Sequence, residues 1–275
     1  MPADDEQRHA ARVQAAAGAA VLATLVLIAI FAPTIAPYPP QLPVARPFLP
    51  PSAAHLLGTT DIGQDVLSMC IWAARWTLLV AALVTAISTV LSWVAGVAAG
   101  FWPSLDAPAT GLADLLLALP GVPLALLVVT LAGPSLVTVV LTLGLLSWPA
   151  FARIVRAHVL GLRARPYVTA GRALGASELR LAVRHIVPGT LGLLPAKIAL
   201  TVRFAVFAEA TLAFLGLGDP STPSWGGMLG WAFNDPLLFT RPTWGWIVGP
   251  PALLITVTVL ASTWLATGLE EGRRR

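Results

Sequence analysis

Residues 165–191, RPYVTAGRALGASELRLAVRHIVPGTL, form a polar, arginine-rich stretch between two long apolar segments. Pro166 can open a helix, because the first turn does not need its missing N–H, and Pro188 can end one, because proline inside a helix removes a hydrogen bond. These two prolines predict a helix over residues 166–188. Small and apolar side chains recur in it at three- and four-residue steps, which predicts one narrow packing face. The face comprises Ala170, Leu174, Ser177 and Leu181.

The glycines and charges of this stretch predict a neighbouring surface. Gly171 and Gly175 each weaken a helix by about 1 kcal/mol relative to alanine, so their presence indicates that another surface comes close to the backbone. Arg180 and Arg184 form a like-charge pair one turn apart, and Glu178 faces neither of them. The helix is therefore expected to carry positive charge that an anionic neighbour would neutralise.

The composition of the chain is that of an integral membrane protein. Of its 275 residues, 57% are hydrophobic and 11% are charged, whereas a soluble domain carries about a quarter charged residues. The chain has 16 arginines and one lysine, gathered beside the apolar segments, which the positive-inside rule explains without a nucleic-acid partner. The single cysteine, Cys70, excludes a disulfide framework and a cysteine metal site.

Apolar runs long enough to cross a bilayer as a helix occur six times. We therefore expect an all-α membrane protein with six transmembrane helices, in which the loop between spans four and five carries the polar helix. The spans are expected at residues 13–36, 75–101, 111–132, 135–152, 191–217 and 244–269. The chain then divides into a tail (1–12), a first transmembrane helix (13–36), a loop (37–73), a core (74–269) with loops at 153–190 and 218–243, and a second tail (270–275).

The distribution of arginines predicts the orientation. With a cytoplasmic N-terminus, the seven arginines from Arg153 to Arg184 and the last three residues of the chain also lie inside. Arg46 and Arg241 are left outside, together with Arg75 at a span boundary. Cytoplasmic loops carry the excess of arginine, so we expect this orientation. Both tails and loop 153–190 are then cytoplasmic, and loops 37–73 and 218–243 are external.

The sequence contains no recognisable catalytic or metal-binding pattern. Lys197, the one lysine, is not preceded by glycine, so the chain lacks the G-x-x-x-x-G-K-[ST] phosphate loop and is not expected to hydrolyse ATP itself. The four histidines lack the spacing of zinc ligands, and no nucleophile–base pair stands out. We therefore expect neither an enzyme nor a bound cofactor or metal. A DNA-reading helix between two membrane spans is not expected either.

Three ionisable residues fall at membrane depth: Asp114, Arg203 and Glu209. Charge inside a membrane usually marks a substrate or ion pathway, which makes Glu209 and Arg203 candidates for a translocation path. A structural role is the alternative, because Asp114 lies near a span end and the other two residues can pair with groups elsewhere in the bundle. Arg203 and Glu209 are six residues apart, so they are not expected to pair with each other.

Two kinds of partner would suit the helix of residues 166–188. Anionic lipid headgroups would satisfy the arginines alone. A cytoplasmic protein with a groove for a short helix would also explain the glycines and the small side chains. The residue pattern therefore favours a protein docking site.

Three segments resemble one known family. The run TAGRALGASELRLAVRHIVP (169–188) resembles the cytoplasmic EAA motif of ABC-importer permeases, which is E-A-A-x-x-x-G followed by a proline-ended helix. HLLGTTDIGQDVLSMCIWAARWTLLV (55–80) and EATLAFLGLGDPSTPSWGGML (209–229) are similar to segments of the dipeptide, oligopeptide and nickel branch. Their order and spacing resemble the second permease subunit of such importers. The chain departs from the motif at Thr169, which replaces the glutamate, and at Gly171, which replaces the second alanine.

This resemblance implies a six-span type I importer permease that pairs with a homologous subunit in the inner (plasma) membrane. Two ATP-binding subunits would dock on the polar helices of the pair, and an external solute-binding protein would deliver the cargo. Peptides are the first choice of cargo, and nickel or another small solute is the alternative. The residues expected to contact the ATPase are Ala170, Arg172, Leu174, Gly175, Ser177 and Glu178.

An ion-gradient-driven secondary transporter is the main alternative class. It would need coupling carboxylates near the membrane midplane and often has an inverted internal repeat. The sequence has one deep carboxylate, Glu209, and no obvious repeat between its halves. A purely structural scaffold would leave the resemblances at 55–80 and 209–229 unexplained.

Overall fold

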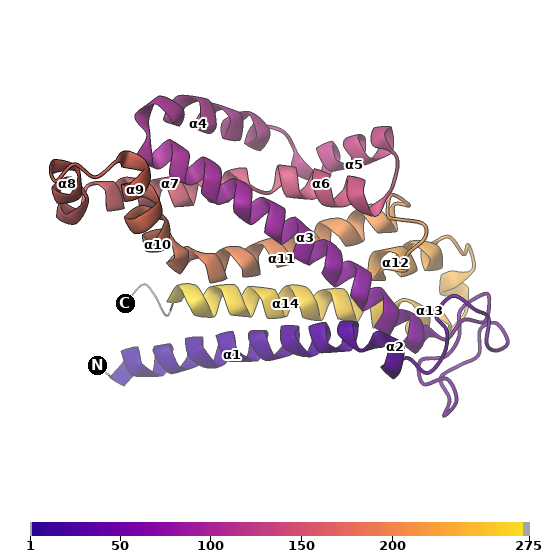
Figure 1. The fold of residues 1–275 in the computed structure, drawn as a ribbon. Helices are drawn as coiled ribbons and strands as arrows, with labels where there is room; N and C mark the ends of the chain where they lie inside the picture. Colours follow the sequence, from indigo (N-terminus) through magenta and orange to yellow (C-terminus); the bar gives the residue numbers. More distant parts are fainter. Residues whose placement is uncertain (1, 272–275) are drawn as a thin grey trace.

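The computed structural model describes residues 2–271, which fold into a bundle of helices (Figure 1). The described ends of the chain lie at the same end of this bundle as the short helices α8 (Pro166–Ala173) and α9 (Glu178–Leu181). We call this the α8 end. The segment of residues 37–65 lies at the opposite end, which we call the loop end. The three C-terminal arginines, expected in the second tail, lie outside the described residues.

Residues 2–271 contain no β-strand, although an isolated bridge joins Thr59 and Asp65. Within this part of the chain, five segments are long and apolar enough to cross a membrane, and a bent pair of helices makes a sixth. The predicted all-α membrane fold is confirmed. The five segments are His9–Ile30, Val66–Phe101, Leu136–Arg163, Glu178–Phe214 and Trp244–Leu269.

The first and last long helices, α1 (Pro2–Ile30) and α14 (Gly249–Glu271), pack side by side. Helix α1 takes in most of the residues expected in the first tail, and it stops before the expected boundary at residue 36. A separate short helix, α2 (Ala32–Ile35), follows it. Pro33 explains the stop, because it has no N–H to continue the hydrogen bonding of α1.

Helix α3 (Val66–Phe101) crosses the bundle and contacts α6 (Leu136–Leu146), α7 (Pro149–Arg163) and α11 (Leu194–Phe214). It starts before the expected residue 75, because the side chain of Asp65 caps it by accepting a hydrogen bond from the Ser68 N–H at 2.8 Å. Branched aliphatic side chains fill the core around α3. They include Val84, Val129, Val139, Leu143, Val206 and Leu212.

The third span is bent, whereas the sequence predicted one helix. Helices α4 (Pro103–Ala118) and α5 (Gly121–Ala132) meet at 87°. Pro120 lies in the break, where it offers no N–H and drives Leu119 out of the helical region to φ −88° and ψ 140°. The apolar run continues through this proline, so its length alone does not reveal the bend.

The segment from α9 to α11 is helical almost throughout. It passes through a π-helical turn (Ala182–Ile186), helix α10 (Val187–Thr190) and a 3₁₀ turn (Leu191–Leu193). The prediction that Pro188 ends a helix is wrong, because Pro188 lies in the first turn of α10, where its missing N–H is tolerated. At the loop end, α12 (Trp225–Phe233), a 3₁₀ turn (Leu238–Thr240) and α13 (Trp244–Ile247) complete the fold.

Candidate functional site

The polar stretch forms two short helices joined by a tight turn, and we call residues 166–181 the elbow. Helix α8 ends at Ala173, and Gly175 follows with φ +82°, a left-handed conformation that glycine adopts without strain. Ser177 then caps α9, where its hydroxyl accepts a hydrogen bond from the Arg180 N–H at 3.3 Å. The predicted single helix is therefore wrong, because a glycine that ends one helix is followed directly by a serine that starts another.

The turn separates side chains that were expected to share a face. Leu174 is 88% exposed at the tip of the elbow, whereas Leu181 is 1% exposed. A Cβ at Gly171 would lie 2.8 Å from Cδ2 of Leu181, so this glycine admits α9 and not a partner protein. The predicted common face of Ala170, Leu174, Ser177 and Leu181 is therefore wrong.

The elbow neutralises part of its own charge. The Arg172 guanidinium donates to both carboxylate oxygens of Glu178, from Nε to Oε1 at 2.5 Å and from Nη2 to Oε2 at 2.9 Å. This hydrogen bonding raises the pKa of Arg172 above its usual value. The sequence did not predict this pair, because residues six apart do not meet on one straight helix. Exposed positive charge stays at Arg165, Arg180 and Arg184.

The base of the elbow belongs to the apolar core of the bundle. Val168 of α8, Leu181 of α9 and Ile186 are buried in one cluster with Phe101 of α3 and Val155 of α7. The tip of the elbow is therefore exposed, whereas its base packs against α3 and α7.

The structure brings all six predicted docking residues onto the elbow. Glu178 is half-buried, and the other five, Ala170, Arg172, Leu174, Gly175 and Ser177, are exposed. Thr169, at the position of the motif glutamate, is exposed as well. Its hydroxyl bonds to the carbonyl oxygens of Arg165 and Pro166, at 3.2 and 3.1 Å, within its own helix.

Glu209 lies far along α11 from the elbow and is 5% exposed. The side chains of Ser224 and Thr77 lie beside its carboxyl group. Its Oε2 atom has no hydrogen-bond partner among the described residues, and it borders a cavity of about 20 Å³, enough for roughly one water molecule. Arg203 is half-buried on the same helix and forms no ion pair with any described residue.

Ion pairs at the α8 end connect α4 to α7. Asp114, which was placed at membrane depth, pairs with Arg153, and both side chains are more than half exposed. Asp106, which sequence reasoning missed, accepts from Nε and Nη2 of Arg156 at 2.6 Å each. The sequence held a signal for this pair, because Asp106 is an acidic residue between two spans and the arginine-rich segment needs acidic partners.

Lys197 is a buried cation that was considered only as part of a phosphate loop. It is 2% exposed in α11, and its Nζ donates to the Ser88 hydroxyl at 2.6 Å. Nζ also lies 5.3 Å from the centre of the Phe151 ring, a cation–π distance. The position of this lone lysine in an apolar segment was the sequence signal for a buried ammonium group.

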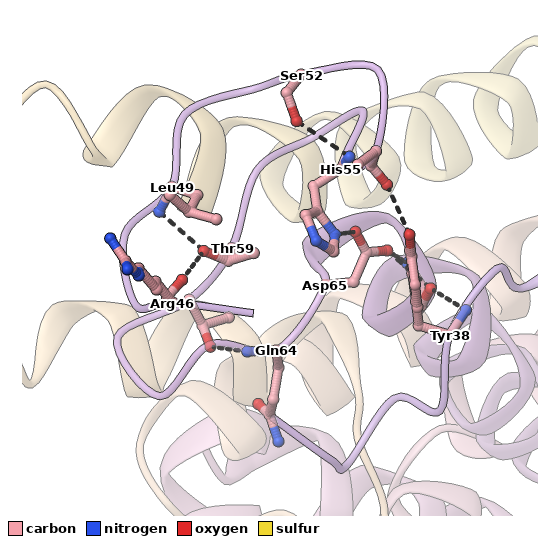
Figure 2. A network of polar contacts seen from close by, with 11 residues as sticks. Tyr38, Arg46, Leu49, Ser52, His55, Thr59, Gln64 and Asp65 are labelled. Carbon is pink, nitrogen blue, oxygen red and sulfur yellow. Dashed lines mark hydrogen bonds and ion pairs between the residues drawn. The ribbon is translucent and has the colours of Figure 1, made fainter. Parts of the chain in front are cut away.

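The loop end has its own polar network (Figure 2). His55 Nδ1 lies 2.9 Å from Oδ1 of Asp65, and the Ser68 hydroxyl donates to Oδ2 of Asp65 at 2.7 Å. The Tyr38 N–H donates to the same hydroxyl at 3.1 Å, and the Tyr38 ring lies 4.9 Å from the His55 ring. This network fixes the proline-rich segment against the start of α3.

The described residues form a helical bundle with membrane-spanning segments and an exposed two-helix elbow, which defines the class of a polytopic membrane protein. Residues 88–275 match the family model described as binding-protein-dependent transport system inner membrane component, and the chain belongs to this family. It is therefore a permease subunit of an ABC importer, as the sequence predicted. The secondary-transporter alternative is not supported.

Three relatives place the chain within the family. It is 37% identical to the di/tripeptide transport system permease protein DppC of Pseudomonas aeruginosa over 90% of this chain and 83% of that protein. It is 39% identical to the dipeptide transport system permease protein DppC of Escherichia coli, over 94% and 87%. The glutathione transport system permease protein GsiD of Escherichia coli is 33% identical, over 90% and 81%.

Proposed function

We propose that this chain forms half of a translocation pathway for short peptides. The names of the three relatives support this cargo, because di- and tripeptides, dipeptides and glutathione are all short peptides. A homologous permease subunit would supply the other half. A solute-binding protein would deliver the peptide from outside, and two separate ATP-binding subunits would hydrolyse ATP.

The proposed orientation puts the α8 end, and with it both termini, in the cytoplasm. The distribution of arginines supports this orientation, because cytoplasmic loops carry an excess of them. Five lie in or beside the elbow: Arg163, Arg165, Arg172, Arg180 and Arg184. The described ends of the chain share this end of the bundle (Figure 1). The loop end is then external and faces the solute-binding protein.

The proposed docking site for one ATP-binding subunit is the elbow, through Ala170, Arg172, Leu174, Gly175, Ser177 and Glu178. The exposure of Leu174 carries this proposal. A leucine that is 88% exposed on a short ordered helix pair suits insertion into an apolar groove of a partner. The Arg172–Glu178 pair beside it would hold α8 and α9 at a fixed angle and give the groove a polar rim.

Coupling would follow from how the elbow is anchored. When the ATP-binding subunits close, the elbow would move with them. It would pull on α3 and α7, because Val168 and Leu181 of the elbow are buried in one cluster with side chains of those helices. Those two helices would carry the displacement into the bundle and shift the population between inward- and outward-open states. Glu209 and Arg203 are proposed residues of the translocation path. The unpartnered Oε2 atom of Glu209 supports its part of this proposal.

The docking site is tested by placing a negative charge at the tip of the elbow. Leu174→Asp should reduce co-purification of the ATP-binding subunits at least tenfold and abolish uptake of a labelled dipeptide, because a carboxylate does not enter an apolar groove. The matched control for co-purification is Leu42→Asp, at an exposed leucine of the opposite, loop end. Normal co-purification and uptake by Leu174→Asp would contradict the docking site. Gly175→Leu is a poorer test, because a left-handed φ of +82° strains any leucine there.

A further inference from the structure

A cavity of about 590 Å³ opens at the loop end, away from the elbow. This volume is within the range of small-molecule binding sites, about 300–1,000 Å³. Its walls come from the segment before α3, the start of α3, α12 and the chain that follows α12. Much of the lining is apolar and includes Val66, Met69, Met228, Leu238 and Ile247.

Hydrogen bonds hold one wall of the cavity in place (Figure 2). The Thr59 hydroxyl accepts from the Leu49 N–H and donates to the Arg46 carbonyl oxygen, each at 2.8 Å. The Gln64 N–H donates to the Thr60 hydroxyl at 3.1 Å, and the Thr60 N–H donates to the Gln64 carbonyl oxygen at 2.9 Å. A wall fixed by its own backbone is typical of a preformed binding site.

The lining also carries an amide and three charged side chains, from Gln64, Asp61, Asp235 and Arg241. Gln64 is 9% exposed, and the bonds drawn to it in Figure 2 come from its backbone and not from its side-chain amide. Asp61 is exposed and forms no ion pair with a described residue. Asp235 lies 3.7 Å from Arg241, whose guanidinium stacks 4.9 Å from the centre of the Phe48 ring. Two carboxylates and one guanidinium give the lining a net negative charge, which favours a cation.

We propose that this cavity binds the amino-terminal residue of a short peptide that has an apolar first side chain. The peptide ammonium group is held between Asp61 and Asp235, the first amide bonds to Gln64, and the side chain packs against the methionines. This inference rests on the proposed peptide cargo and names the residues that receive it. An internal loop of the solute-binding protein has no free α-amino group next to its first amide, so N-acetylation of the peptide separates the two occupants.

The experiment measures binding of radiolabelled Leu-Gly to the two permease subunits in nanodiscs, without nucleotide or ATP-binding subunits. Asp61→Asn and Gln64→Leu should each weaken binding about tenfold, and N-acetyl-Leu-Gly should compete at least tenfold more weakly than Leu-Gly. Gln41→Leu is the matched control, because Gln41 is an exposed glutamine of the same segment that does not line the cavity. The Gln41→Leu variant should bind Leu-Gly with the affinity of the unsubstituted chain.

Three outcomes would overturn the proposal. These are no saturable binding of Leu-Gly, competition by N-acetyl-Leu-Gly as strong as that by Leu-Gly, or an affinity of Asp61→Asn and Gln64→Leu that equals that of the unsubstituted chain. Loss of solute-binding-protein capture in these two variants, with peptide binding unchanged, would assign the cavity to that protein instead. The binding measurement needs no ATP-binding subunit. A negative result would therefore count against the cavity as a peptide site and not against the elbow as a docking site.

Discussion

Thr169 stands where the family motif has glutamate, at an exposed position of α8. It lies in the first turns of α8, where a carboxylate interacts favourably with the helix dipole by about 0.3–1 kcal/mol. Because Thr169 is exposed, we expect Thr169→Glu to insert and to transport a labelled dipeptide at the unsubstituted rate. Thr169→Ala is the control for loss of the hydroxyl. Transport lost in the glutamate variant alone would mean that the docking partner excludes a carboxylate there.

Lys197 allows a residue-scale test of buried charge. Ser88→Ala removes the hydroxyl that accepts from the ammonium group, so we expect a loss of about 1–3 kcal/mol in unfolding free energy. Lys197→Met removes the charge and keeps the length of the side chain, so it should be close to neutral or stabilising. Thermal unfolding of the detergent-solubilised protein gives the ranking. A Lys197→Met variant less stable than Ser88→Ala would contradict this account.

Asp219 should make stability depend on pH at the loop end. The Ser221 hydroxyl and N–H donate to its carboxylate at 2.5 and 2.9 Å, and the Leu136 N–H donates at 3.1 Å. These bonds hold the pKa of Asp219 below its usual value. The stabilisation is therefore present above the unfolded pKa of about 3.9 and is lost as pH falls through the lower folded pKa. The melting-temperature difference between the unsubstituted chain and Asp219→Asn should shrink in acid, and a constant difference would contradict the assignment.

At the scale of elements, hydropathy was enough to locate the helices but not their breaks. The apolar runs predicted the spans and the position of the polar loop, because burial in lipid demands long apolar helices. The bend at Pro120 and the turn at Gly175 depend on local backbone preferences that a hydropathy pattern does not carry. The turn also creates the Arg172–Glu178 pair, since residues six apart on one straight helix point in different directions.

The turn of the elbow can be tested by two substitutions of one glycine. Gly175→Ala should destabilise the elbow by about 1–2 kcal/mol, because alanine resists the left-handed conformation at φ +82°. Gly175→Asn should be milder, because asparagine tolerates that conformation. Hydrogen–deuterium exchange of α8 and α9 measures the difference. Equal exchange in the two variants would mean that the turn does not hold the elbow.

In the whole molecule, docking of an ATP-binding subunit at the elbow requires the two ends of the bundle to lie on opposite sides of the membrane. Cys70 is the only cysteine and is buried, so Cys70→Ala gives a background for labelling. In intact cells, an impermeant maleimide should label Leu42→Cys at the loop end and spare Leu174→Cys at the elbow tip. Labelling of Leu174→Cys but not of Leu42→Cys would mean that the orientation is the opposite one and that the elbow is not in the cytoplasm.

We propose that a separate ATP-hydrolysing subunit drives this permease through contact with the elbow. The decisive measurement is cross-linking from Leu174→Cys to the ATP-binding subunit in the assembled importer that carries Cys70→Ala. We predict a cross-linked product whose formation blocks dipeptide uptake, while Leu191→Cys, half exposed and outside the elbow, gives much less of it. An importer that transports at full rate while Leu174→Cys forms no cross-link with that subunit would contradict the account.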